Sequence, residues 1–169
     1  MGAVVVYESM FGNTRIIAEA IAEGLRASDP GVQVAVMPVA EAASGKLTGA
    51  DLLVVGAPTH FSRMSTPRSR KAFAAGPGVR EWLAALPAAP PGRRAAAFDT
   101  RLSYPLAGSA AGPISRRLHR RGYQIAARPA GFIVQHSKGP LKDGERERAR
   151  AWGAGLTREP VHRTGSHQP

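Results

Sequence analysis

Residues 3–26 combine a strand pattern, a polar loop and a helix pattern, and this combination limits the possible fold more than any other feature. Residues 3–7 (AVVVY) form a short β-branched run that is typical of a strand buried on both faces. From Thr14 onward, Ile17, Ile21 and Leu25 recur with the period of a helix, and charged residues line the opposite face. The chain is therefore expected to begin with a strand, a tight turn and a helix.

The loop between the two patterns (SMFGNT, residues 9–14) is rich in hydrogen-bond donors. Ser9 and Thr14 offer hydroxyls, Asn13 offers an amide, and Gly12 allows the backbone to come close to a ligand. A strand–loop–helix turn of this kind aims backbone N–H groups and a helix N-terminus at a phosphate. An ordinary turn capped by Asn13 or Thr14 is the alternative, but the density of donors favours an anion site.

The rest of the chain alternates strand and helix patterns. Further strands are expected at residues 32–39, 51–56, 94–98 and 123–136. Pro38 would lie near the end of the first of these or at an edge position, the apolar strand at 51–56 would be central, and the last strand would be interrupted at 129–131. Further helices are expected from Pro67 to Phe73, at 82–86, around Ile114 and Leu118, and after a capping Asp143 with Ala149, Trp152 and Leu156 facing inward. This alternation predicts an α/β fold with a parallel sheet covered on both faces. Residues 1–157 are the expected domain, and residues 158–169 are expected to form a flexible tail.

Three irregular, polar loops follow the first, third and fourth strand patterns. They comprise residues 8–14, 57–64 and 99–112. Because ligands of open parallel sheets bind at the carboxyl ends of the strands, we expect these loops to form one site.

Several classes of site are excluded or disfavoured by the sequence. The chain contains no G-x-x-x-x-G-K-[ST] motif, and its first turn has no G-x-G-x-x-G motif. The absence of cysteine excludes disulfides, thiolate catalysis and cysteine-based metal sites. The histidines lack metal-ligand spacing, so we predict no metal site, and we assign no catalytic acid or base.

Charge is distributed unevenly along the chain, whose formal net charge is +11. Residues 1–60 contain three basic and six acidic side chains, whereas residues 61–169 contain twenty basic and six acidic ones. Such a surface could attract nucleic acid, anionic lipid, or an acidic protein or substrate, and a solvated arginine-rich face is the alternative interpretation. Only 6% of residues are aromatic, which argues against nucleic-acid binding. No apolar run approaches the length of a membrane span, and a cytoplasmic location is expected.

Residues 5–21 (VVYESMFGNTRIIAEAI) resemble the flavodoxin signature across strand, loop and helix. This resemblance implies a flavodoxin-like three-layer sandwich over residues 3–157, with a five-stranded parallel sheet of order 2-1-3-4-5. It also implies FMN as the cofactor. The residues that would hold the FMN phosphate are Ser9, Met10, Phe11, Gly12, Asn13 and Thr14. Phe11 stands where flavodoxins usually have a third hydroxyl residue, although its backbone N–H is still a donor.

The second and third loops contain the residues that the resemblance places beside the flavin ring. Residues 58–61 (Pro58, Thr59, His60 and Phe61) are similar to the flavin-flanking loop of FMN-dependent quinone reductases of this fold. An exposed loop histidine is an alternative interpretation of His60. Asp99, Thr100 and Arg101 would border the other edge of the ring.

The resemblance implies an FMN-binding electron-transfer protein or an FMN-dependent reductase, for example of quinone-like acceptors. Its partner would be a redox protein or a small electron acceptor, acidic or anionic. Arg63 and Arg101 near the ring would make the bound flavin less reducing. The alternative is a binding module without redox activity that uses its arginine-rich surface for a protein or nucleic-acid partner.

Overall fold

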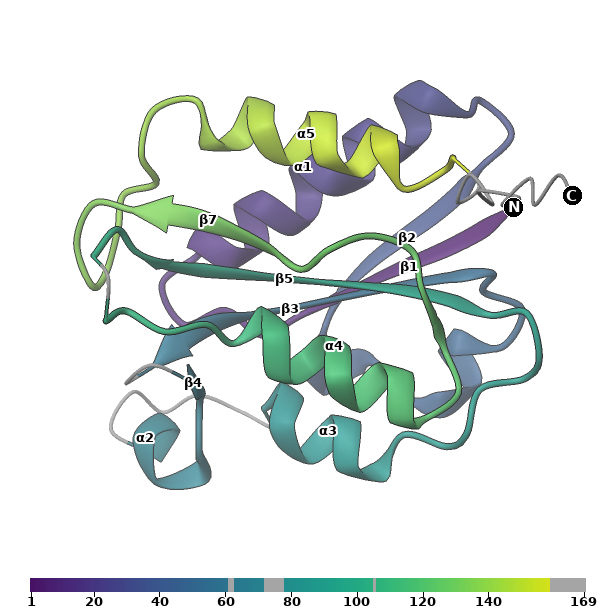
Figure 1. Ribbon diagram of the computed structural model, residues 1–169, viewed down its shortest axis with the longest axis horizontal. Coiled ribbons are helices and arrows are strands. Elements are labelled where there is room, and N and C mark those ends of the chain that lie inside the picture. The colour runs from purple at the N-terminus through teal and green to yellow at the C-terminus, as the bar shows by residue number, and fades with distance from the viewer. Residues whose placement is uncertain (61–62, 72–77, 105, 159–169) are drawn as a thin grey trace, which may run out of the picture.

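A parallel β-sheet with helices on both faces forms the centre of the molecule (Figure 1). The structure is a computed structural model that describes residues 1–60, 63–71, 78–104 and 106–158. The strands are β1 (Gly2–Tyr7), β2 (Gln33–Pro38), β3 (Leu52–His60), β5 (Arg94–Leu102), β6 (Gln124–Ile125) and β7 (Ala130–Val134). Their order is β2-β1-β3-β5-β6, and β7 pairs with β5 farther along the same side. Because β6 and β7 together fill the fifth position, the predicted flavodoxin-like order 2-1-3-4-5 is confirmed.

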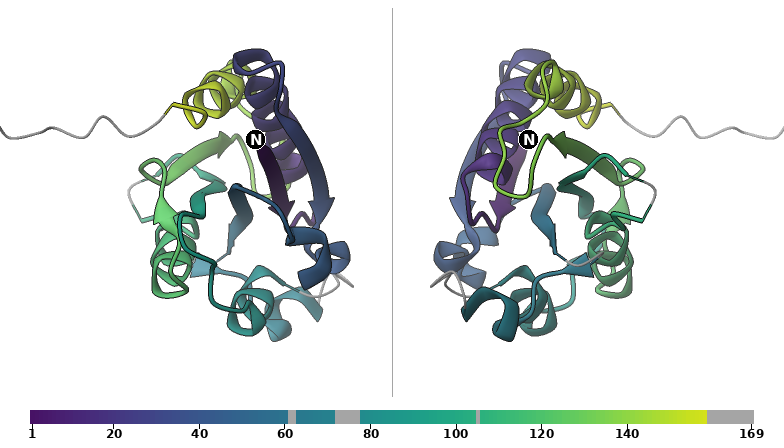
Figure 2. Two further views of the ribbon diagram at one scale, coloured as in Figure 1. Left: turned by 90° about the vertical axis from the view of Figure 1, so that its right-hand side faces the viewer. Right: turned by 90° about the vertical axis from the view of Figure 1, so that its left-hand side faces the viewer.

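Two helices cover each face of the sheet. Helices α1 (Asn13–Ser28) and α5 (Glu145–Gly155) lie on one face, and α3 (Val79–Ala85) and α4 (Ala111–Arg120) lie on the other (Figures 1 and 2). Helix α2 (Pro67–Lys71) and the short strand β4 (Arg63–Met64), which pairs antiparallel with β3, lie at the carboxyl edge of the sheet. The turns Val39–Glu41 and Ser44–Leu47 are 3-10 helices. Within the described residues, none of the helices has the length and hydrophobicity that a membrane span requires.

The alternation of side chains along each strand divides the hydrophobic core in two. In β1, Val5 faces the core beneath α1 and α5, whereas Val4 and Val6 face the core beneath α3 and α4. In β5, Phe98 belongs to the first core and Ala97 to the second. Both faces of these strands are buried, which explains their uninterrupted apolar sequences.

Most of the predicted elements are present. The predicted inward residues of α1 (Ile17, Ile21 and Leu25) are fully buried, and Pro38 ends an edge strand. The strand predicted at 123–136 is interrupted, as expected, although the gap falls between β6 and β7.

The ends of β3 and β5 correct the prediction. The sequence pattern predicts loops at 57–64 and 99–112, but residues 57–60 and 99–102 belong to strands. The ladder continues past the apolar run because Ala57 and Pro58 pair with β5, and β5 pairs with β7 up to Leu102. The polar residues predicted for two loops are therefore held on regular strands.

Two helix caps also differ from the sequence interpretation. Gly144 precedes α5 as its N-cap with φ +83° and without a side-chain cap, so the assignment of Asp143 as the cap was wrong. Gly12, rather than Asn13 or Thr14, is the N-cap of α1. The predicted end of α2 at Phe73 and residues 159–169 of the predicted tail lie outside the described residues.

Candidate cofactor site

The first loop (residues 8–14) comprises the link between β1 and α1 and the first two residues of α1, and it lies at the carboxyl edge of the sheet, which faces the viewer in the right panel of Figure 2. Gly12, the N-cap of α1, has φ +89° and offers no side chain of its own to the helix that follows. The Ser9 hydroxyl oxygen accepts hydrogen bonds from the Gly12 N–H at 3.1 Å and, more weakly, from the Arg15 N–H at 3.4 Å. Two main-chain N–H groups, one from the loop and one from the first turn of α1, thus converge on a single oxygen, as they would on an anion.

Thr14 joins the first loop to β5. Its hydroxyl lies 2.8 Å from the hydroxyl of Thr100, and both residues are buried. Two residues predicted from separate loops therefore meet in the structure. Burial raises the pKa of the neighbouring Tyr7, although Arg15 opposes this effect, so the phenol at the end of β1 stays uncharged near neutral pH.

The turn after β7 also reaches the first loop. The side-chain amide of Asn13 donates a hydrogen bond to the Lys138 carbonyl oxygen at 3.1 Å. The Lys138 ammonium nitrogen lies 5.8 Å from the centre of the Phe11 ring. The site predicted from the sequence did not include this turn. It could have been expected there, because the carboxyl ends of all parallel strands lie at the same edge of the sheet.

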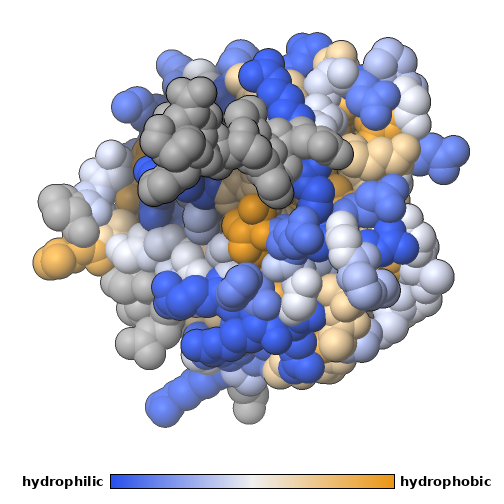
Figure 3. All heavy atoms as spheres, turned by 45° about the vertical axis from the view of Figure 1, so that its right-hand side comes forward, coloured by the Kyte–Doolittle hydropathy of each residue, from blue (hydrophilic) through white to orange (hydrophobic). Residues whose placement is uncertain are grey.

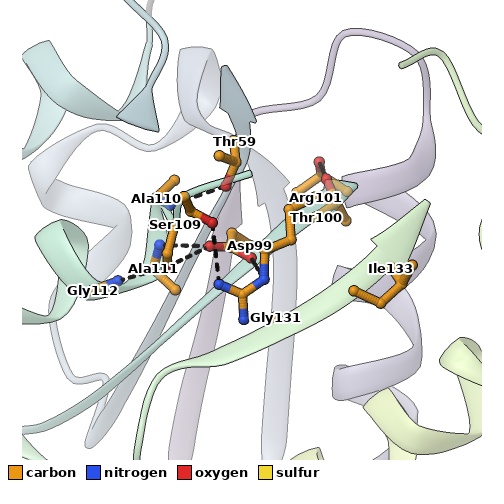
Figure 4. A network of polar contacts seen from close by, with 12 residues as sticks. Thr59, Asp99, Thr100, Arg101, Ser109, Ala110, Ala111, Gly112, Gly131 and Ile133 are labelled. Atoms are coloured by element: carbon orange, nitrogen blue, oxygen red, sulfur yellow. Dashed lines mark hydrogen bonds and ion pairs between the residues drawn. The ribbon is translucent and has the colours of Figure 1, made fainter. Parts of the chain in front are cut away.

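Asp99 and Thr59 cap the N-terminal turn of α4 from two neighbouring strands (Figure 4). The Asp99 carboxylate, which is completely buried, accepts hydrogen bonds from the Ser109 hydroxyl at 2.7 Å and the Ala111 N–H at 3.0 Å. The Thr59 hydroxyl oxygen accepts one from the Ala110 N–H at 3.0 Å. Both side chains thereby fix α4 against the carboxyl edge, a role that the sequence interpretation did not include.

Arg101 forms an ion pair with Asp99 rather than presenting an uncompensated charge. Its Nε lies 3.5 Å from the second Asp99 carboxylate oxygen, which has no hydrogen-bond partner among the described residues. A further guanidinium nitrogen donates to the Gly108 carbonyl at 3.4 Å, and the group packs so tightly on Gly131 that a Cβ there would overlap it. The pair has no net charge, so Arg101 would contribute less to the flavin potential than an isolated cation.

An open groove runs beside the end of β5. It has a volume of about 670 Å³ and is lined by Arg101, Leu102, Ser103, Tyr104, Ala107, Gly108, Ser109 and Ile133. The Tyr104 side chain is 54% exposed at its rim. The groove adjoins the predicted residues of β5 and includes Arg101, one of them, in its lining.

A buried polar network around Glu8, at the start of the first loop, was not predicted from the sequence. One Glu8 carboxylate oxygen accepts a hydrogen bond from the Ser65 hydroxyl, and the other accepts the Val79 N–H at 2.9 Å. Arg70, also buried, donates to Ser65 at 2.8 Å and pairs with Glu81 at 2.6 Å. Glu8 thus connects the end of β1 to the segment after β4 and to the start of α3.

The remaining predicted residues can be placed only in part. Met10 belongs to the first loop and is half-buried, and Pro58 lies on β3 beside Thr59. His60 ends β3 and pairs through its backbone with Arg63, whereas Phe61 lies outside the described residues. Among the described residues, no group of three or more histidine or acidic side chains could hold a metal ion.

The comparisons with known proteins agree with this fold and with the position of the first loop. The flavodoxin family model matches residues 5–75, which include the end of β1, the first loop, α1, β2 and β3. No curated protein matches the chain. The chain is similar to a flavodoxin structure from the domain Archaea, with a TM-score of 0.69, 22% identity and coverage of 92% of this chain and 96% of the other. Oxidised flavodoxin 1 from Bacillus cereus gives a TM-score of 0.69 at 21% identity, with 93% and 97% covered.

A third structure, the flavodiiron core of Flv1 from Synechocystis, gives a TM-score of 0.66 at 16% identity. The match covers 92% of this chain but 35% of that one. Together these findings define a flavodoxin-like α/β protein and confirm the predicted resemblance to the flavodoxin family. FMN is the cofactor of this family.

The residues of the first loop fit the phosphate of FMN. The N-cap of the 16-residue helix α1 is Gly12, and no atom lies within 4 Å of the position that a Cβ on Gly12 would take. The loop therefore combines convergent main-chain donors with open space, as an anion site requires.

Proposed function

We propose that this protein binds FMN at the carboxyl edge of its sheet and transfers electrons between FMN and a redox partner. The observation that carries this proposal is the first loop, where the family match coincides with a glycine N-cap and with main-chain N–H groups that converge on the Ser9 hydroxyl. Bound FMN supplies reversible electron transfer, and the chain supplies binding and orientation.

The proposed binding residues lie on three converging segments. Residues 9–14 would hold the phosphate through main-chain N–H groups, with the Ser9 hydroxyl as a further donor. The ends of β3 and β5 would border the ring, and the Thr59 hydroxyl, which accepts from Ala110, keeps its own proton for donation. Asp99 and Arg101 would act mainly by holding α4 and the 108–110 segment in place.

Reduction of a quinone-like acceptor is a more specific version of this proposed function, and one observation favours it. The groove beside β5 is open and adjoins the proposed ring position, with the exposed Tyr104 at its rim. A planar acceptor could therefore stack close to the flavin.

The surface over α3 and α4 suits an acidic or anionic partner. Figure 3 shows strongly hydrophilic side chains gathered on this side of the molecule. Arg116 and Arg120 are exposed on α4. Burial, and after it the positive charges of Arg80 and Arg120, lowers the pKa of Arg117. Salt would weaken any attraction that this surface exerts.

Titration of the cofactor-free protein with FMN and riboflavin, followed by quenching of flavin fluorescence, tests the proposal. We expect one FMN per chain and binding of riboflavin that is weaker by at least about ten-fold, because riboflavin lacks the phosphate. A protein that binds neither flavin would contradict the proposal. In that case the alternative, a binding module that acts through its arginines, would be favoured.

A further inference from the structure

Lys138 is the cationic side chain that the fold brings over the first loop. Its ammonium nitrogen lies 5.8 Å from the centre of the Phe11 ring, in the middle of the loop. We propose that Lys138 binds the phosphate of FMN together with the main-chain donors of residues 9–14. This inference rests on the proposed function and adds an ionic contact to a site otherwise made of neutral donors.

The backbone fixes the position of the turn that carries Lys138. The Gly139 N–H donates to the His136 carbonyl at 2.9 Å, and the Gln135 N–H donates to the Pro140 carbonyl at 2.9 Å. Gly139 has φ +100°, and a Cβ there would lie 2.6 Å from the side-chain oxygen of Asn13. Only a residue without a side chain allows the turn to pack so closely on the first residue of α1.

A second contact holds the same turn against the loop without using the lysine side chain. The Asn13 amide donates to the main-chain carbonyl of Lys138 at 3.1 Å. The anchoring of the turn is therefore independent of the residue type at position 138. Replacing the side chain should remove the charge and leave the turn in place.

The charges around Lys138 leave its ammonium group available for an anion. The Glu8 carboxylate is buried and engaged by Ser65 and Val79, and Glu19 pairs with Arg15. Lys138 is exposed and forms no ion pair within the part of the chain that the structure describes. A phosphate monoester carries nearly two negative charges at neutral pH and is the natural partner for such a group.

The experiment compares the wild type with Lys138→Gln, Lys138→Arg and the control Lys46→Gln in titrations with FMN and with riboflavin. Lys46 is exposed on the 3-10 helix Ser44–Leu47, near Gly49, which lies against Gly2 at the opposite end of β1. We expect Lys138→Gln to weaken FMN binding about five-fold, as for a partly exposed charged contact, and to leave riboflavin binding unchanged. Lys138→Arg should keep most of the affinity, and Lys46→Gln should keep all of it.

Ionic strength provides an independent readout. Between 50 and 500 mM salt, the wild-type affinity for FMN should fall more steeply than that of Lys138→Gln, because the variant has lost one ionic contact. Equal urea midpoints for wild type and variant would show that the fold is retained.

Two results would overturn the inference. One is that the wild type binds FMN and Lys138→Gln binds it equally tightly, which leaves the proposed function intact. The other is that the variant loses FMN and riboflavin affinity in the same proportion, which indicates a structural role. A wild type that binds no FMN would overturn both proposals, so the two failures are distinguishable.

Discussion

Gly12 is the residue whose backbone conformation most directly shapes the first loop. It has φ +89° and serves as the N-cap of α1. Because no atom lies within 4 Å of the position that a Cβ would take, a side chain here would meet open space. The cost of a substitution is therefore conformational, about 1–2 kcal/mol for an ordinary L-residue and less for asparagine.

We predict that Gly12→Ala lowers the free energy of unfolding by about 1 kcal/mol, whereas Gly12→Asn lowers it by less than half as much. Urea denaturation of the cofactor-free protein measures both changes. The same order is expected for FMN affinity, because the loop donors depend on this backbone conformation. An alanine variant as stable as the wild type would show that the loop does not require a positive φ.

At the residue scale, the sequence predicts the first loop well because its signal is local. The strand pattern, the donors and Gly12 are contiguous, and Thr14 begins the helical pattern. Glu8 and Lys138 carry no local signal of their roles. Glu8 acquires its partners from residues 65 and 79, and Lys138 reaches Phe11 across more than 120 positions. Such contacts depend on the tertiary fold and cannot be inferred from the periodicity of hydrophobic residues along the sequence.

At the scale of elements, β3 and β5 show why strand ends were predicted too short. The apolar runs end near Gly56 and Phe98, but pairing continues to His60 and Leu102. Neighbouring strands supply the hydrogen bonds there, so polar residues such as Asp99 and Thr100 can extend the ladder. Strand length is set by pairing partners as well as by side-chain hydrophobicity.

The pairing of α1 with α5 depends on two close backbone contacts. A Cβ on Gly24 would overlap the carbonyl oxygen of Arg150, and one on Gly153 would overlap that of Ile21. Glycine at these helical positions therefore serves packing, although it lowers helix propensity. By contrast, Gly155 at the end of α5 has no atom within 4 Å of its would-be Cβ.

Alanine at these two kinds of glycine should have opposite effects. Gly24→Ala is expected to destabilise the protein by about 1–3 kcal/mol, since α1 and α5 would have to separate. Gly155→Ala is expected to be neutral or to stabilise by up to about 1 kcal/mol through helix propensity alone. Thermal and urea unfolding measure both variants. Equal effects would show that the two helices do not pack through Gly24.

At the scale of the whole molecule, the two faces of the sheet pack in the hydrophobic cores, whereas its carboxyl edge carries the candidate site. Two hydrophobic cores bury the faces of the sheet, and the carboxyl edge collects the first loop, the ends of β3 and β5 and the turn after β7. The positive net charge comes entirely from residues 61–169, because the first 60 residues contain more acidic than basic side chains. Because Arg101 is paired with Asp99, this charge would act more on the choice of partner than on the flavin itself.

A crystal structure of the FMN complex, grown at saturating FMN, tests the central claim most directly. The account predicts that phosphate oxygens lie within hydrogen-bond distance of main-chain nitrogens in residues 10–14, with the ring along the ends of β3 and β5. The phosphate bound elsewhere, with the first loop still closed around the Ser9 hydroxyl, would contradict it.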